Sequence, residues 1–163
     1  MTLQQQIETF LTGTPHAVVG ASRDRTKYGN KVLRAYLQGQ RVVYPVNPRV
    51  EIVEGLTAFP NLASLPQAVH GLSIVTPPQV TEQIVAQAAR LGIGHIWMQP
   101  GSESTQAVEL AQQAGMNVIW GGPCILVALR FHEEDPRTDV TGERPGKLGR
   151  DVGESPIELA GGN

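Results

Sequence analysis

Residues 17–37 read AVVGASRDRTKYGNKVLRAYL, in which an apolar run leads through a glycine and a polar loop into a helical pattern. The apolar run, HAVVG at 16–20, is typical of a buried strand. The helical pattern runs from Tyr28 to Gln38, with Gly39 as its C-cap. Its apolar residues recur at spacings of three and four: Val32, Leu33, Tyr36 and Leu37. A strand, a glycine turn and a helix open many dinucleotide-binding folds, but the usual Gly-x-Gly-x-x-Gly is absent. The stretch therefore predicts a strand-turn-helix unit with an unusual loop.

The rest of the chain continues the alternation of strands and helices. Apolar and β-branched runs predict four further strands, at 41–48, 71–76, 94–99 and 116–120. Helical spacing predicts a helix in the first dozen residues, one that Thr76 caps ahead of Pro77, and one capped by Ser102 or Ser104. This alternation favours an α/β fold, with a parallel sheet of about five strands covered by helices on both faces.

The order of the strands is limited by right-handed crossovers, which leave few topologies. We expect a Rossmann-like, doubly wound sheet with the order 3-2-1-4-5, counting the predicted strands along the chain. In that order a ligand crevice lies at the carboxyl ends of the first and fourth strands.

Composition limits the classes of function. The chain of 163 residues is about one domain long. Its formal net charge of -2 does not favour binding to nucleic acid or to an anionic membrane. No apolar run approaches the ~20 residues that span a bilayer, and the N-terminus lacks a secretory pattern, which predicts a cytoplasmic protein. The single cysteine, Cys124, and four scattered histidines argue against disulfides and a metal site.

The character of the chain changes after Phe131. We place one domain at 1–131, with its core at 14–127. The segment 132–163 is charged and rich in glycine and proline, which indicates a tail, either disordered or laid over the domain or a partner subunit.

The loop after the first strand has the composition of a phosphate site. Gly20 allows a tight turn, and Ala21 and Ser22 are small enough for a ligand to approach the backbone. Three cations follow in the same loop: Arg23, Arg25 and Lys27. The loop therefore predicts a phosphorylated ligand; the alternative is an ordinary turn whose charges face solvent.

The residues at the end of the second strand distinguish between the possible ligands. An NAD site places a carboxylate there for the ribose hydroxyls, whereas YPVNPR has none before Glu51. Arg49 instead suits a ribose phosphate, as in NADP or coenzyme A, unless it is a plain loop charge. Because hydride transfer needs a substrate domain, and the chain ends soon after the fifth strand, we favour coenzyme A. An NADP-binding oxidoreductase subunit or redox sensor, and an acyl-CoA-processing enzyme, are the alternatives.

Six segments, in this order, carry a resemblance to a known family: VVGAS, RVVYPVNPR, GLTAFPNLASLP, GLSIVTPP, IGHIWMQPGSESTQAVELAQQAGMNVI and GGPC. They resemble the small stand-alone CoA-binding proteins, which are similar to the N-terminal CoA-binding domain of the succinyl-CoA synthetase alpha subunit. The resemblance covers about residues 14–127 and implies a Rossmann-like fold that holds coenzyme A or an acyl-CoA. The synthetase's catalytic histidine belongs to a second domain with no counterpart here, so the expected role is non-catalytic or regulatory, alone, as a homo-oligomer or beside a partner enzyme subunit.

Carried over by position, the resemblance assigns candidate ligand-binding residues to four segments. The phosphate loop corresponds to Gly20, Ala21, Ser22 and Arg23, beside the cations Arg25 and Lys27. The segment that reaches the adenosine corresponds to Asn47, Pro48 and Arg49. The border of the nucleotide corresponds to Thr76, Pro77 and Pro78, and the loop near the pantetheine to Gln99, Pro100 and Gly101.

Four other residues admit two interpretations each. Cys124 could face the thiol of bound coenzyme A and form a mixed disulfide, or it could be a buried structural cysteine. His95 could act as a base, although a packed histidine is the commoner case. Trp97 and Trp120 are expected to pack, whereas a ring at a strand end could instead stack on adenine.

Overall fold

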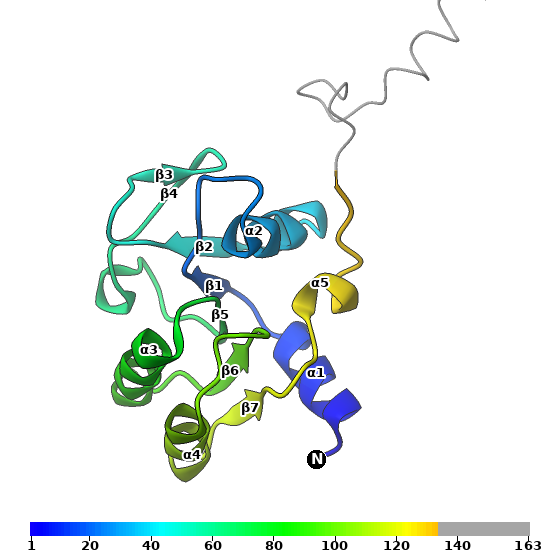
Figure 1. Ribbon diagram of the computed structural model, residues 1–163, viewed down its shortest axis with the longest axis vertical. Helices are drawn as coiled ribbons and strands as arrows, with labels where there is room; N and C mark the ends of the chain where they lie inside the picture. Colours follow the sequence, from blue (N-terminus) through cyan, green and yellow to red (C-terminus); the bar gives the residue numbers. More distant parts are fainter. Residues whose placement is uncertain (134–163) are drawn as a thin grey trace, which may run out of the picture. The chain divides into compact units, whose positions relative to one another are not determined.

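A computed structural model describes residues 1–133, in which helices pack on a parallel sheet (Figure 1). Its central sheet has five parallel strands: β1 (His16–Val19), β2 (Val43–Val46), β5 (Gly71–Ile74), β6 (His95–Met98) and β7 (Asn117–Ile119). The predicted α/β class, with its parallel sheet of about five strands, is confirmed. The predicted tail, apart from residues 132 and 133, lies outside the described residues.

The order of the strands differs from the expected one in the place of a single strand. The sheet runs β2-β1-β5-β6-β7, so β5, the third predicted strand, pairs with β1 and β6 and does not lie beyond β2. Both orders obey right-handed crossovers, but all four residues of β5 are buried, which suits an inner strand. The chain reverses direction across the sheet between β1 and β5, and the ligand crevice belongs there, not between the first and fourth strands.

The helices cover both faces of the sheet (Figure 1). On one face, α1 (Leu3–Thr12), α2 (Tyr28–Gln38) and the short α5 (Ile125–Ala128) share an apolar cluster with β1 and β6. On the other face, α3 (Pro78–Arg90) and α4 (Thr105–Gln113) pack on a second cluster with β5 and β6. The two cores are what a doubly wound sheet requires. None of the helices within residues 1–133 is long and apolar enough to cross a membrane.

The ends of the helices follow local chemistry. The structure confirms the predicted bounds of α2, which ends at Gly39, and Ser104 caps α4 by accepting a hydrogen bond from the amide of Ala107 at 2.9 Å. The expectation that Thr76 caps α3 is wrong, because Pro77 is the N-cap residue and the Thr76 hydroxyl is 2.7 Å from that of Thr81.

Two segments contain elements that the sequence pattern did not specify. Between β2 and β5, β3 (Ile52–Val53) and β4 (Leu56–Thr57) form a small hairpin, and η1 (Leu62–Ser64) follows. The hairpin turns at Glu54 and Gly55, both with positive φ. Helix α5 is a single turn, which is too short to show a helical period in sequence.

Candidate functional site

The turn from β1 into α2 depends on two glycines. Gly20 has φ +94°, and a Cβ atom there would overlap the carbonyl oxygen of Val75, just past β5. A Cβ atom on Gly29, in the first turn of α2, would overlap the carbonyl oxygen of Gly20. Gly29 therefore permits the close contact of helix and strand that the third glycine of the dinucleotide pattern normally permits. Sequence reasoning missed it because the longer loop displaces it from the expected spacing.

This turn presents backbone amides that have no partner among residues 1–133. They are the N–H groups of Ala21, Ser22 and Arg23 in the loop and of Tyr28 and Gly29 in α2. Lys27, the N-cap residue of α2, offers no side-chain cap to them. Free amides and the positive end of a helix together favour an anion, and above all a phosphate.

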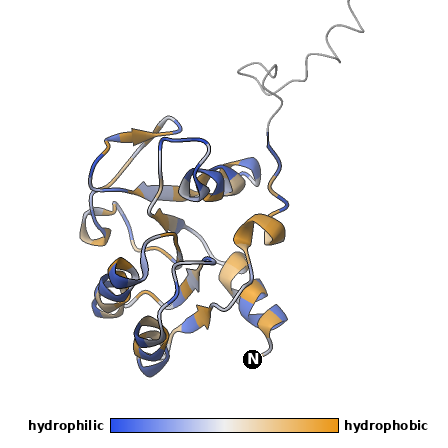
Figure 2. Cartoon of the chain, viewed as in Figure 1, coloured by the Kyte–Doolittle hydropathy of each residue, from blue (hydrophilic) through white to orange (hydrophobic). Residues whose placement is uncertain are grey.

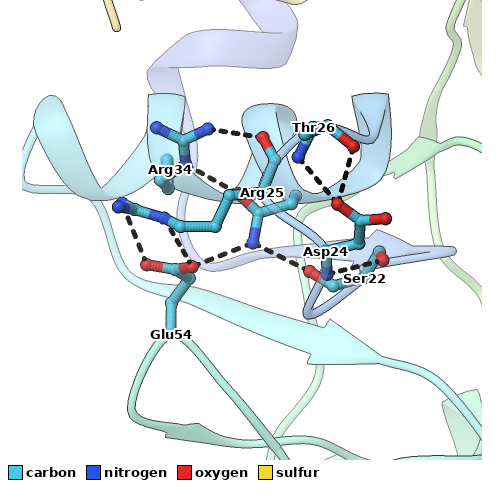
Figure 3. A network of polar contacts seen from close by, with 7 residues as sticks. Ser22, Asp24, Arg25, Thr26, Arg34 and Glu54 are labelled. Carbon is cyan, nitrogen blue, oxygen red and sulfur yellow. Dashed lines mark hydrogen bonds and ion pairs between the residues drawn. The ribbon is translucent and has the colours of Figure 1, made fainter. Parts of the chain in front are cut away.

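The cations of the loop differ in their surroundings. Arg23 and Lys27 are exposed, whereas Arg25 forms an ion pair with Glu54 at the tip of the β3–β4 hairpin, with 3.2 Å between Nε and Oε2 (Figure 3). The carboxylate of Asp24 accepts hydrogen bonds from the amide and hydroxyl of Thr26, and these bonds lower the pKa of Asp24. The loop is therefore internally braced before any ligand arrives.

Two further side chains of α2 hold the loop, and the sequence reasoning named neither. Asn30 donates to the carbonyl oxygen of Ser22 at 2.8 Å and to the carboxylate of Glu54 at 2.9 Å. Arg34, which is buried, donates to the Asn30 side chain at 2.6 Å and to the carbonyl oxygen of Arg25 at 3.0 Å (Figure 3). The sequence did contain a signal for these two residues, because both lie within the apolar stripe of the predicted helix. A polar side chain that is buried there must form hydrogen bonds.

The end of β2 is fastened to the same loop. The Asn47 side chain donates to the carbonyl oxygen of Ala21 at 2.7 Å and accepts from the amide of Arg49 at 2.7 Å. Pro48 and Arg49 are exposed beyond it. Asn47 thus positions the loop, while Arg49 presents its charge to solvent.

A cleft of about 630 Å³ opens at the carboxyl edge of the sheet beside the start of α2. Its lining comes from the ends of β5 and β6, from α2 and from the segment before α5: Tyr28, Val75, Thr76, Pro77, Pro100, Gly101, Ser102 and Cys124. Four of the predicted residues line the cleft, namely Thr76, Pro77, Pro100 and Gly101, and Pro78 begins α3 next to it. The structure therefore brings the loop after β5 and the loop after β6 together around one hollow.

Gln99 lies behind the wall of this cleft. Its side chain is fully buried and its Oε1 atom accepts from the amide of Ile125 at 2.9 Å and from the Tyr28 hydroxyl at 3.3 Å. The same hydroxyl is in hydrogen-bonding contact with the Cys124 thiol. Burial, and then the contact with Cys124, raise the pKa of Tyr28, which stays a protonated donor. In this structure Gln99 joins three elements and does not face the hollow.

The histidines gather at the opposite edge of the sheet. His16, His70 and His95 lie at or beside the amino ends of β1, β5 and β6, where the rings of His70 and His95 stack with centroids 4.0 Å apart. Burial lowers the pKa of His16 to about 4, and burial followed by the charge of His70 lowers that of His95. His95 is thus far in the fold from the cleft, and no set of three or more ligating side chains in residues 1–133 is arranged for a metal ion.

The two tryptophans also differ. Trp97 is fully buried and donates from its indole nitrogen to the carbonyl oxygen of Pro123 at 3.0 Å. Trp120, just past β7, is 47% exposed and lines a separate hollow on α4. Neither ring lines the cleft of 630 Å³.

Comparisons with known proteins agree on one family. The family model described as "CoA binding domain" matches residues 15–130. A curated relative, the acetate–CoA ligase [ADP-forming] II subunit alpha of Pyrococcus furiosus, is 30% identical over 87% of this chain and 33% of its own length. This chain thus spans a third of that relative, and 17% of the acetate–CoA ligase [ADP-forming] I of Archaeoglobus fulgidus, which is 25% identical.

Two solved structures are also similar to this chain. A conserved hypothetical protein from Pyrococcus furiosus is 36% identical, with a TM-score of 0.66 over 69% of this chain and 97% of that chain. The dinucleotide-forming acetyl-coenzyme A synthetase 1 of Ca. Korarchaeum cryptofilum, in complex with phosphate and ADP, is 28% identical, with a TM-score of 0.58 over 66% of this chain and 25% of that chain. The likeness thus extends to a short protein along nearly its whole length and to one segment of a longer enzyme.

Proposed function

The chain belongs to the CoA-binding domain family, and on this premise we propose that it binds coenzyme A at the carboxyl edge of its sheet. The observation that carries the proposal is the turn built on Gly20 and Gly29, whose unpartnered amides lie next to an apolar cleft. A phosphate-binding turn beside an apolar hollow matches a ligand that has phosphates at one end and an uncharged arm at the other.

The phosphates would be held mainly by backbone. In the proposed complex the amides of Ala21, Ser22 and Tyr28 donate to the pyrophosphate at the N-terminus of α2. Arg23 and Lys27 add exposed positive charge beside it. Arg25 has a different task, since its pairing with Glu54 braces the loop. Hydrogen-bonded amides fix the position of the anion, and the mobile cations add attraction.

The two ends of the ligand would follow the two sides of this loop. The adenosine end extends past Asn47 and Pro48, where Arg49 meets the phosphate on the ribose. The pantetheine arm lies in the cleft against Val75, Thr76 and Pro77, with its thiol toward Gly101 and Cys124.

We propose binding, and not ligation, as the activity of this chain. The relative from Pyrococcus furiosus is named as the alpha subunit of a ligase and is about three times as long as the matched region. Within residues 1–133 the cleft is lined by no histidine or carboxylate that could relay a phosphoryl group. A non-catalytic or regulatory role, alone or beside a partner enzyme subunit, fits such a site.

Calorimetric titration with coenzyme A, dephospho-CoA, NADP and NAD tests the proposal. We expect coenzyme A to bind, NAD not to bind, and dephospho-CoA to bind more weakly because Arg49 loses its phosphate partner. In the Arg49→Gln variant, coenzyme A and dephospho-CoA should bind equally. Binding of NADP without binding of coenzyme A would overturn the proposal in favour of a redox protein.

A further inference from the structure

A second hollow, of about 670 Å³, lies between α1 and α5. One wall is the face of α1 that carries Ile7 and Leu11, and the facing wall is Val127 and Ala128 of α5, with Trp97 beneath. Figure 2 shows α5 in the colour of hydrophobic residues along its length, and Val127 is 78% exposed. We call this hollow the α1–α5 groove. Its volume is that of a small-molecule site.

The groove and the CoA cleft meet at one residue. Cys124 lines both hollows, from the segment that leads from β7 into α5. This segment contains Gly121 and Gly122, both with positive φ, and a Cβ atom added to either would meet no other atom within 4 Å. A group attached to a thiol beside Cys124 would therefore lie at the residue that borders both hollows.

We propose that the α1–α5 groove receives the apolar acyl group of an acyl-CoA thioester. This inference rests on the proposed binding of coenzyme A and specifies the ligand class of that site. The walls formed by Ile7, Leu11 and Val127 favour a hydrocarbon chain or an aromatic ring. The charged side chains of its lining, Glu8 and Arg41, have opposite signs and cancel, so a dicarboxylic acyl group gains no charge complement.

Titration with coenzyme A, acetyl-CoA, hexanoyl-CoA and succinyl-CoA tests this inference. We expect hexanoyl-CoA to bind at least about tenfold more tightly than free coenzyme A, because burial of only two methylene groups corresponds to that ratio. Acetyl-CoA and succinyl-CoA should bind about as coenzyme A does.

Paired variants locate the acyl group. Val127→Glu places a charge on the groove wall and should remove the preference for hexanoyl-CoA while the affinity for free coenzyme A is unchanged. Leu91→Glu is the matched control, because Leu91 is 51% exposed at the end of α3 on the other face of the sheet, and it should keep the preference. Leu11→Gln, on the facing wall, repeats the test.

The outcomes separate this inference from the proposed function. Equal affinities for coenzyme A and hexanoyl-CoA would overturn the acyl assignment and leave the CoA site standing. A preference that survives both Val127→Glu and Leu11→Gln would place the acyl group elsewhere and also overturn it. Failure of every CoA compound to bind would overturn the proposed function itself.

Discussion

Single glycines decide whether the loop after β1 can form. Gly29 lies in the first turn of α2, where alanine would ordinarily raise helix propensity. Here, however, the added methyl group would overlap the carbonyl oxygen of Gly20, which lies in the phosphate-binding turn. Packing against the strand therefore outweighs helix propensity at this position.

We predict that Gly29→Ala destabilises the protein by about 1–3 kcal/mol and weakens coenzyme A binding, because α2 must move away from the turn. Gly39→Ala is the matched control at the other end of the same helix: Gly39 has φ -85°, and a Cβ atom there would make only ordinary contacts from 3.6 Å outward. Urea unfolding and calorimetry measure both effects. Equal stability of the two variants would refute the role given to Gly29.

Glu54 is a second residue whose effect on coenzyme A binding can be tested by a single substitution. Its carboxylate pairs with Arg25 and accepts from Asn30, which places a negative charge beside the proposed phosphate site. We predict that Glu54→Gln tightens coenzyme A binding severalfold at low salt, since the repulsion is removed, and that the gain shrinks as salt screens it. Glu51→Gln, in the same exposed segment, should change the affinity little. Weaker binding in Glu54→Gln would show instead that bracing the loop matters more than charge.

At the scale of helices and strands, the sequence predicted the elements that are long enough to show a repeating pattern of apolar residues. The apolar stripe of α2 predicted its bounds correctly, because three helical turns repeat the pattern. Helix α5 was missed since one turn contains no repeat, although it directly follows Cys124 and forms one wall of the groove. Gln99 shows the related limit: the resemblance assigned it to the ligand-binding loop near the pantetheine, but its side chain is buried and accepts from the amide of Ile125.

The amino ends of three strands make the fold sensitive to acid. Burial of the His16 ring disfavours its protonation most, and His70, Arg41 and His95 disfavour it further, whereas the hydrogen bond of 2.8 Å to the carbonyl oxygen of Phe10 favours it. Its pKa is about 4 in the folded chain, against the ordinary histidine pKa of 6.5. The unfolded chain therefore takes up a proton first as the pH falls.

We predict that this contribution to stability is complete above about pH 6.5 and is lost progressively as the pH falls toward 4, on the order of 3 kcal/mol in total. Urea unfolding between pH 7.5 and 4.5 measures it. His16→Gln keeps a donor for Phe10 but does not titrate, so its stability should depend less on pH. An unchanged dependence in that variant would assign the acid sensitivity to other groups.

For the whole molecule, the class of fold followed from the sequence but the order of the strands did not. Alternating strands and helices predicted the doubly wound sheet, and both candidate orders satisfied the same rule of handedness. The choice depends on whether β5 enters beside β1 or beyond β2, which no local pattern encodes. Because β5 lies beside β1, the crevice is next to Gly20 and Val75, and the phosphate-binding turn adjoins the cleft.

The central claim, that this edge of the sheet holds the phosphates of coenzyme A, is tested most directly by amide NMR spectra during titration with coenzyme A. We predict that the largest shifts occur at Ala21, Ser22, Tyr28 and Gly29, four of the five amides of this turn that lack partners in the described part of the chain. Smaller shifts should follow at Val75 and Gly101 along the cleft. Saturable shifts confined to residues outside this edge, with the four amides unmoved, would contradict the account.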